Sequence, residues 1–431
     1  ARIARKAIHY LHQAGERAIR MSAYQEAIAH YTRGLALLSS QPESPSREEQ
    51  ELALQISLGI AWKGRMPDPE GEKALTRARE LCERTGNKSQ LGRVVGELAV
   101  FPYVRAEHGK ARELGEEALS TAAQGKDPLL SAVAHWHLGY VSFALGEHAV
   151  ARDHLQQEIS FYRPRTHHQP FVYMRGSDAG VSALAYDACC LWCLGYPDQA
   201  LQRSREAVAL ARELDHTFSL IDVLCFAGCL FHGLRRDAKD MQAYAEELMP
   251  LSKGLGSLSF WGTGTCYWGQ ALSMLGQVQA GIAQMRAGVE ERRSIGARCY
   301  SSGILGALAE AQAMEGRPDE GLVTLDEALA LVAETDERYC EAELHRLRGE
   351  LLLARGDEAG AEAGFRQAIV VARRQQAKSW ELRAATSLAG LLQAQERTGE
   401  ARKALAEIYD WFTEGFDTPD LLAARALLDL S

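Results

Sequence analysis

The sequence lacks the short motifs that mark most nucleotide-binding and hydrolytic enzymes. No G-x-x-x-x-G-K-S/T phosphate loop occurs, because Gly125-Lys126-Asp127 has neither the earlier glycine nor the hydroxyl residue. There is also no H-E-x-x-H zinc motif and no G-x-S-x-G nucleophile turn. We therefore predict that the chain is not an enzyme and has no catalytic residues, no cofactor and no bound metal.

Long apolar runs are also missing. No stretch reaches the length needed to cross a membrane, and residues 1–6 lack the continuous apolar core of a signal peptide. We therefore expect a cytoplasmic protein without a membrane partner. The chain has no initiator methionine and begins inside a helical pattern, from which we infer that a domain is missing upstream.

Positive charge is not in surplus. The chain has 48 Lys and Arg against 57 Asp and Glu, and its formal net charge is -9. Because nucleic-acid binding needs basic side chains to replace phosphate counterions, this balance argues against a nucleic-acid partner. The nine cysteines are an odd number and lie mostly in apolar helical runs, which predicts reduced, buried thiols rather than disulfides.

What the sequence does contain is a repeated pattern of small residues. Gly139 is followed by Gly146 seven residues later, and by Ala151 five residues after that. Small residues allow two helices to approach closely, and the second glycine can end the first helix. A small residue recurs at this landmark position at spacings of 47, 37, 40, 49, 38, 43, 40, 40 and 40 residues. The ten landmarks are Ala27, Ala74, Ala111, Ala151, Ala200, Ala238, Gly281, Gly321, Ala361 and Ala401.

A glycine five residues before the landmark marks the turn of six of these units, Gly233 being the one before Ala238. In residues 195–198 and 316–319 the glycine ends one helix, and a proline lies in the first turn of the next. No strand-like alternation is sustained anywhere. We predict an all-α fold of about ten helix-turn-helix repeats of about 40 residues.

Two stretches break the period. Residues 39–46 are polar and rich in proline, and residues 163–178 combine prolines, histidines, arginines and aromatics. We predict a repeat array over residues 1–418, with irregular loops at 39–46 and 163–178. Residues 419–431 form an amphipathic pattern that we interpret as a C-terminal capping helix over the last apolar face.

The repeat resembles the helical hairpin of the tetratricopeptide repeat (TPR), although its period is near 40 rather than about 34 residues. The resemblance implies a TPR-like α-solenoid, coiled as a right-handed superhelix. It also implies that the first helix of each hairpin lines the concave side.

Residues 10–31, 194–201, 341–352, 378–388 and 411–418 carry a more specific likeness. Together they resemble the C-terminal TPR region of bacterial STAND-class signalling ATPases (signal-transduction ATPases with numerous domains). The resemblance implies an array that serves as sensor or partner-binding arm of an ATPase module, often behind an N-terminal class III adenylate or guanylate cyclase domain. The turn Gly-x-Asp-Pro-Gly-Val of that family is kept at 176–181, except that Ala179 replaces the proline.

Aromatic side chains are the first candidates for binding. Phe260, Tyr300, Cys340 and Trp380 stand 40 residues apart, and Trp261 adds to them. In a regular array these residues form a column. The column is either packing between helices or a platform for a ligand on the concave wall.

Charged residues on the first helices are the second set of candidates. Opposite charges recur at matching repeat positions, as at Glu341 and Glu381. They form either salt bridges between repeats, which contribute little when exposed, or a polar binding strip. The set is Arg298, Glu341, Glu343, Arg346, Glu381 and Arg383.

The end of the 163–178 segment supplies two further candidates, Arg175 and Asp178. Asp178 either caps the following helix or contacts a ligand. Cys190 and Cys193 form a C-x-x-C pair, but they lie in the middle of an apolar helix, which favours a core position over redox or zinc chemistry.

These patterns predict a non-catalytic sensor or protein-interaction module. It would bind an effector or partner on its concave face and regulate an upstream ATPase, cyclase or transcriptional output. The alternative is a TPR scaffold that binds a protein or peptide and no small molecule. The expected partners are a protein or peptide, a small-molecule effector or both, and the missing upstream ATPase domain of the same chain.

Overall fold

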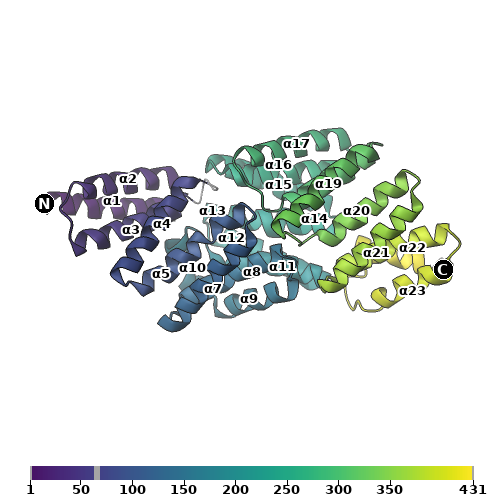
Figure 1. The fold of residues 1–431 in the computed structure, drawn as a ribbon, viewed down its shortest axis with the longest axis horizontal. Coiled ribbons are helices and arrows are strands. Elements are labelled where there is room, and N and C mark those ends of the chain that lie inside the picture. The colour runs from purple at the N-terminus through teal and green to yellow at the C-terminus, as the bar shows by residue number, and fades with distance from the viewer. Residues whose placement is uncertain (1, 63–67, 430–431) are drawn as a thin grey trace.

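The protein is a solenoid of paired α-helices, described here by a computed structural model that covers residues 2–62 and 68–429 (Figure 1). Within these two ranges the chain forms helices and turns but no β-strand. The prediction of an all-α, TPR-like array is thereby confirmed.

The helices follow one another as antiparallel hairpins, each made of a first and a second helix. The N-terminal half contains α1 (Arg2–Arg20) with α2 (Tyr24–Ser39), α3 (Pro45–Ala61) with α4 (Pro69–Thr85), α5 (Lys88–Leu98) and α6 (Val100–Val104) with α7 (His108–Gly125), α8 (Pro128–Ala144) with α9 (His148–Phe161), α10 (Pro164–Arg175), and α11 (Ala179–Cys193) with α12 (Pro197–Glu213).

The C-terminal half begins with a hairpin whose first arm is composite, because a π-helical segment interrupts it. The elements are α13 (Thr217–Val223), η2 (Leu224–Leu230) and α14 (Phe231–Arg235) with α15 (Ala238–Gly254), α16 (Leu258–Met274) with α17 (Val278–Ser294), α18 (Ser301–Met314) with α19 (Pro318–Thr335), α20 (Glu341–Ala354) with α21 (Glu358–Arg374), α22 (Lys378–Ala394) with α23 (Thr398–Tyr409), and α24 (Pro419–Asp429).

Small landmark residues bring the two helices of a hairpin together. A Cβ atom added to Gly269 on α16 would lie 2.6 Å from the carbonyl oxygen of Gly281 on α17 and 2.8 Å from the backbone nitrogen of Met285. Nine of the ten landmarks are buried. This explains the pattern in the sequence, because larger side chains would push the helices of a hairpin apart.

The landmark predicted for the sixth hairpin, which runs from α13 to α15, is misplaced by three residues. Ala238 is only the first residue of α15, whereas Met241 is fully buried and donates its N–H to Asp237, as Ala361 does to Asp357. Met241 and not Ala238 therefore occupies the landmark position. The mistake arose because this hairpin places a methionine where the others place alanine or glycine.

The segment 163–178, which we expected to be an irregular loop, contains helix α10. Pro164 starts this helix, since proline fits the first helical position, and Gly176 ends it with a left-handed φ of 75°. Phe171 and Val172 bury its apolar side. The other predicted loop, 39–46, is shorter than expected, because α2 continues to Ser39 and α3 begins at Pro45.

Successive turns of the solenoid pack on each other. The backbone N–H groups of Arg338 and Tyr339 both donate to the carbonyl oxygen of Ala144, at 2.8 and 3.1 Å. The backbone N–H groups of Arg298 and Cys299, just before α18, donate in the same way to the Val104 carbonyl oxygen. The Ser379 hydroxyl donates to the Trp192 carbonyl at 2.5 Å. The first helices of distant hairpins thus share one continuous core.

One helical stretch, 217–235, is apolar and long enough by length and composition to cross a membrane. The sequence alone did not suggest it, because Asp222 and His232 interrupt its apolar residues. Most of this stretch is buried inside the protein. It has the character of a core helix and is weak support for a membrane span.

Candidate functional site

A cavity of about 280 Å³ lies between the first helices of five hairpins, α14, α16, α18, α20 and α22. We call the face that these helices share the inner wall. Five consecutive hairpins therefore contribute to the cavity. Cys340 and Trp380 of the aromatic column line it, together with Tyr267 and Tyr339. The Tyr267 hydroxyl is buried and makes no hydrogen bond among residues 2–62 and 68–429, so Tyr267 contributes no accessible polar atom to the cavity.

Glu343 is the charged centre of this cavity. Arg346, one turn further along α20, donates two hydrogen bonds to its carboxylate at 2.9 and 2.8 Å. Arg383 of α22 approaches the same carboxylate at 3.5 Å. Burial opposes the ionisation of Glu343, but the two guanidinium groups outweigh it and lower the pKa of Glu343 to about 2. The carboxylate is therefore ionised at neutral pH.

Arg383 is held in place from several directions. Its guanidinium donates to both carboxylate oxygens of Asp420, at 3.0 and 2.5 Å, and to the Leu234 carbonyl at 2.9 Å. It also lies over the rings of Trp192 and Trp380, at 5.3 and 5.0 Å from their centroids. Because its donors are occupied, Arg383 shapes the wall of the cavity and has little capacity left for a ligand.

Arg236 is the cation of the cavity with most capacity to bind. Its guanidinium lies 3.6 Å from Glu310 and 3.6 Å from Glu343, and it makes no hydrogen bond within the described part of the chain. Repulsion from Arg383 and burial lower its pKa, although Glu343 opposes this shift. The side chain keeps 35% of its surface exposed, so an anion from outside can reach it.

The backbone of Arg236 is unusual for a bulky residue, because its φ is 60°. Arg236 ends α14, at the turn position where five other hairpins have a glycine with positive φ. A side chain other than glycine costs about 1 kcal/mol in this conformation. The five glycines are Gly146, Gly195, Gly276, Gly316 and Gly356.

A second, more enclosed cavity of about 90 Å³ lies nearer the N-terminus. Tyr300 borders it, and its hydroxyl is hydrogen-bonded to those of Tyr103 and Tyr186, at 2.6 and 3.3 Å. Arg175 also borders it, with its guanidinium 3.6 Å from the ring centroid of Trp136. Two of the predicted candidates, Arg175 and Tyr300, thus lie together here and apart from Glu343.

Asp178 is wholly buried and serves as the cap of α11. One carboxylate oxygen accepts the N–H groups of Gly180 and Val181, and the other accepts from the Tyr162 hydroxyl and lies 2.7 Å from Nδ1 of His168. Both oxygens are in use inside the protein. Of the two roles that we considered for Asp178, the structure supports the capping role.

The remaining candidates lie in pairs outside these two cavities. Glu381 pairs with Arg373 and Lys378, at 2.6 and 2.8 Å, and Arg298 pairs with Glu334 at 2.7 Å. Glu341 pairs in the same manner with Arg338 and Arg374, at 3.1 and 2.9 Å. Trp261 packs against Lys253, whose ammonium lies 5.3 Å from the ring centroid. These contacts hold neighbouring helices together.

Sequence reasoning missed Arg236 and Glu310. A signal for Arg236 was present, since the turn before α15 lacks the glycine of the other turns, but we took Gly233 as that glycine. In the structure Gly233 lies within α14 and borders the cavity. Glu310 gave no signal, because a single glutamate on a helix surface is common. Cys190 and Cys193 are buried free thiols, as predicted.

The fold and its inner wall define a TPR-like α-solenoid. No protein-family model and no curated protein sequence matches the chain. The chain is similar in structure to a Rap protein complexed with competence and sporulation factor, with TM-score 0.62 and 12% identity over 86% of this chain and 99% of that one.

A second similar structure is the Rap conjugation gene regulator of plasmid pLS20 in complex with a Phr peptide, with TM-score 0.51 and 14% identity over 85% of this chain and 96% of that one. A STAND protein with a TPR sensor from Pyrococcus horikoshii matches with TM-score 0.47 and 11% identity, over 86% of this chain and 54% of that one. At these identities the first two likenesses establish the fold alone.

Proposed function

We propose that this chain is a non-catalytic sensor and interaction module that binds a short peptide, or a small effector with a carboxylate, in the cavity around Glu343. The observation that carries the proposal is Arg236. This guanidinium stands at a strained turn position, borders the cavity around Glu343 and has N–H donors that no hydrogen bond uses. Strained residues of this kind concentrate at functional sites.

The chemistry of the cavity suits a peptide terminus. Arg236 provides donors for a carboxylate, and Glu310 provides an acceptor for an N–H or ammonium group. The walls between these groups are aromatic and aliphatic. A volume of about 280 Å³ is at the small end of ligand sites, which fits one end of a peptide or a small acid.

The two similar Rap structures favour a peptide over a free metabolite. One is described in complex with competence and sporulation factor and the other in complex with a Phr peptide. A shared solenoid does not transfer a ligand, so these complexes support the choice of a peptide but do not identify its site. A protein partner without a small molecule remains the alternative form of the same proposal.

We further propose that the module regulates a signalling ATPase, or an associated cyclase or transcriptional output. The support is the resemblance of residues 341–352, 378–388 and the other quoted stretches to the STAND-class TPR region. In such an arrangement, ligand binding at the inner wall would change how the solenoid restrains its neighbouring domain. Nucleic acid is not part of the proposal, given the net charge of -9.

Thermal-shift screening of the purified chain tests the site. The library holds short peptides with free C-terminal carboxylates and small organic acids. We expect a ligand that raises Tm and loses at least about tenfold in affinity in Arg236→Gly, the cost of one good charged hydrogen bond. Glu396→Gly is the matched control, because Glu396 has the same turn position with φ 62° in the tenth hairpin.

A ligand that binds Arg236→Gly as tightly as the unchanged chain would exclude this cavity as the site. Co-purification separates the two forms of the proposal. A stoichiometric protein that is released by Arg236→Gly, with no small ligand found, would establish the scaffold form.

A further inference from the structure

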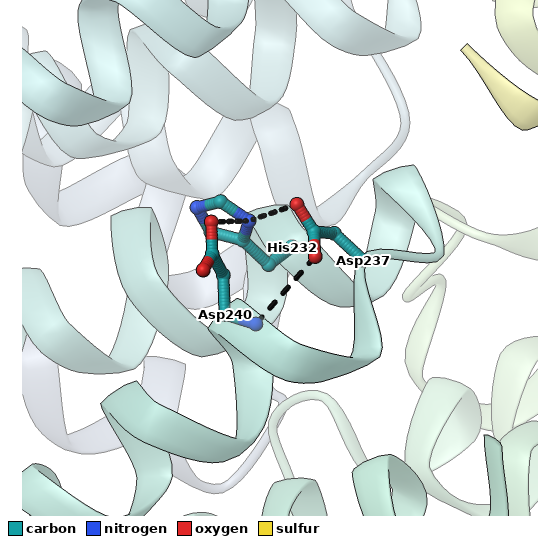
Figure 2. Close-up of side chains that lie close together, drawn as sticks. All are labelled: His232, Asp237 and Asp240. Carbon is teal, nitrogen blue, oxygen red and sulfur yellow. Dashed lines mark hydrogen bonds and ion pairs between the residues drawn. The ribbon is translucent and has the colours of Figure 1, made fainter. Parts of the chain in front are cut away.

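We propose that the chain binds a divalent transition-metal cation, of the class of Zn²⁺ or Mn²⁺, through His232, Asp237 and Asp240. His232 lies in α14, Asp237 caps α15 and Asp240 lies in the first turn of α15, so the three side chains meet at the turn between the two helices (Figure 2). The proposal is independent of the ligand site around Glu343 and departs from our expectation of no bound metal.

The geometry of the three side chains is that of a ligand set. Nδ1 of His232 lies 3.4 Å from a carboxylate oxygen of Asp237 and 3.8 Å from one of Asp240. One ligand atom from each residue lies within 4.8 Å of the other two. Ligand atoms of a tetrahedral zinc ion at about 2.0–2.1 Å are about 3.3–3.4 Å apart, so small rotations of the aspartates would complete the site.

His232 is the buried member of the set. It is 1% exposed, and neither ring nitrogen makes a hydrogen bond within residues 2–62 and 68–429. A buried imidazole without a hydrogen bond is costly. Figure 2 shows the ring held between the two carboxylates, with Nδ1 directed at both. An ion between these three atoms would satisfy Nδ1.

Local structure directs the carboxylates toward the imidazole. Asp237 is the N-cap of α15 and uses one oxygen to accept the Asp240 N–H at 3.5 Å, which leaves its second oxygen for His232. Asp240 lies in the first turn of α15, three residues on and therefore on the same face. The positive end of the helix disfavours a cation, but two carboxylates supply more than the opposing charge.

The donor set also selects the kind of ion. One imidazole nitrogen suits Zn²⁺ and Mn²⁺, whereas Mg²⁺ and Ca²⁺ prefer sites made only of oxygen. The side chains of Asp237 and Asp240 are 36% and 56% exposed, so an ion can enter from solvent and keep water on its open side. Arg236 stands between His232 and Asp237 in the sequence. A bound ion would therefore also stiffen the turn that presents Arg236 to the cavity around Glu343.

The ninth hairpin, formed by α20 and α21, offers a matched control. Asp357 caps α21 with φ -89° and ψ 78°, close to the -94° and 80° of Asp237. The residues that correspond to His232 and Asp240 are Leu352 and Gly360 there. This hairpin has the same cap without the other two ligands, and we expect no metal site in it.

Isothermal titration of the full chain with ZnCl₂ and MnCl₂, after removal of metal by a chelator, tests the proposal. We expect one equivalent to bind at pH 7, and affinity to fall at least about tenfold in Asp240→Asn. His232→Leu, which copies the ninth hairpin, removes the nitrogen ligand and has the same effect. Asp357→Asn leaves the affinity unchanged.

Two results would overturn the proposal. One is the absence of saturable binding by the unchanged chain. The other is equal affinity in the unchanged chain and in Asp240→Asn, which would place the ion away from these three residues. Because Asp240 is exposed, its variant keeps the test valid even if His232→Leu fails to fold.

Discussion

Glu343 and Arg346 form a paired contact through two parallel hydrogen bonds, at 2.9 and 2.8 Å, on the inner wall of the solenoid. The Arg346 side chain is 5% exposed and also donates to Glu350 at 2.9 Å. A bidentate pair of this kind fixes the position of the carboxylate. The wall of the cavity is therefore preorganised, and its charges are set before any ligand arrives.

The first prediction concerns acid stability. The folded-state pKa of Glu343 is about 2 and lies below its ordinary value of 4.5, so its contribution is complete above pH 4.5 and is lost as pH falls toward 2. We expect Glu343→Gln to lower the free energy of unfolding at pH 7 by about 3 kcal/mol. Urea unfolding from pH 7 to pH 2 should show this difference shrinking; a difference constant with pH would contradict the assignment.

The second prediction concerns the turn at Arg236. Arg236→Gly relieves the left-handed strain at a φ of 60° but adds chain entropy to the unfolded state. We expect the free energy of unfolding to change by less than about 1 kcal/mol. Thermal unfolding followed by circular dichroism measures this. A large loss of stability would mean that Arg236 serves the fold rather than a ligand.

The third prediction separates two helical glycines. A Cβ atom at Gly281 would lie 2.8 Å from the Ser273 nitrogen and would also collide with the Gly269 carbonyl. We expect Gly281→Ala to lower the free energy of unfolding by about 2 kcal/mol. A Cβ atom at Gly390 meets nothing within 4 Å, so Gly390→Ala should raise stability by up to about 1 kcal/mol. Equal effects in denaturant titrations would refute the close approach of α16 and α17.

The fourth prediction concerns the contact between solenoid turns. The amides of Arg338 and Tyr339 precede α20 and make no helical hydrogen bond, yet both donate to the Ala144 carbonyl. Hydrogen exchange followed by mass spectrometry should find them as protected as amides within helices. Rapid exchange at both amides would show that the two turns separate in solution. The exposed amide of Gly109 gives the scale, because it lies in the first turn of α7 and has no helical acceptor.

Several features of the fold were readable from residues close together in the chain. Ala361 and Gly356 placed a hairpin because one buries a small face and the other ends a helix. The sixth hairpin was misplaced because Met241 fills the landmark and Arg236 replaces the turn glycine. Helix α10 was missed because its two prolines resemble a loop, although Pro164 only opens the helix and Phe171 is buried.

The candidate site was only partly readable. Repeat spacing singled out Glu343 in the charged set and Trp380 in the aromatic column, and the structure brings both to one cavity. The same spacing could not tell that Glu381 and Arg298 are occupied by ion pairs away from it. Nor could it find Glu310, whose importance depends on the neighbours that the fold brings to it.

The sequence by itself determined the helical hairpins and their approximate number, because small residues, turn residues and helical period act over one hairpin. Only the tertiary structure decided which inner residues face a cavity and which are sealed in the core. That outcome depends on contacts such as Ser379 with Trp192, which are 187 residues apart. Packing of one solenoid turn on another buries most of the inner wall, and leaves the Glu343 cavity where that packing is incomplete.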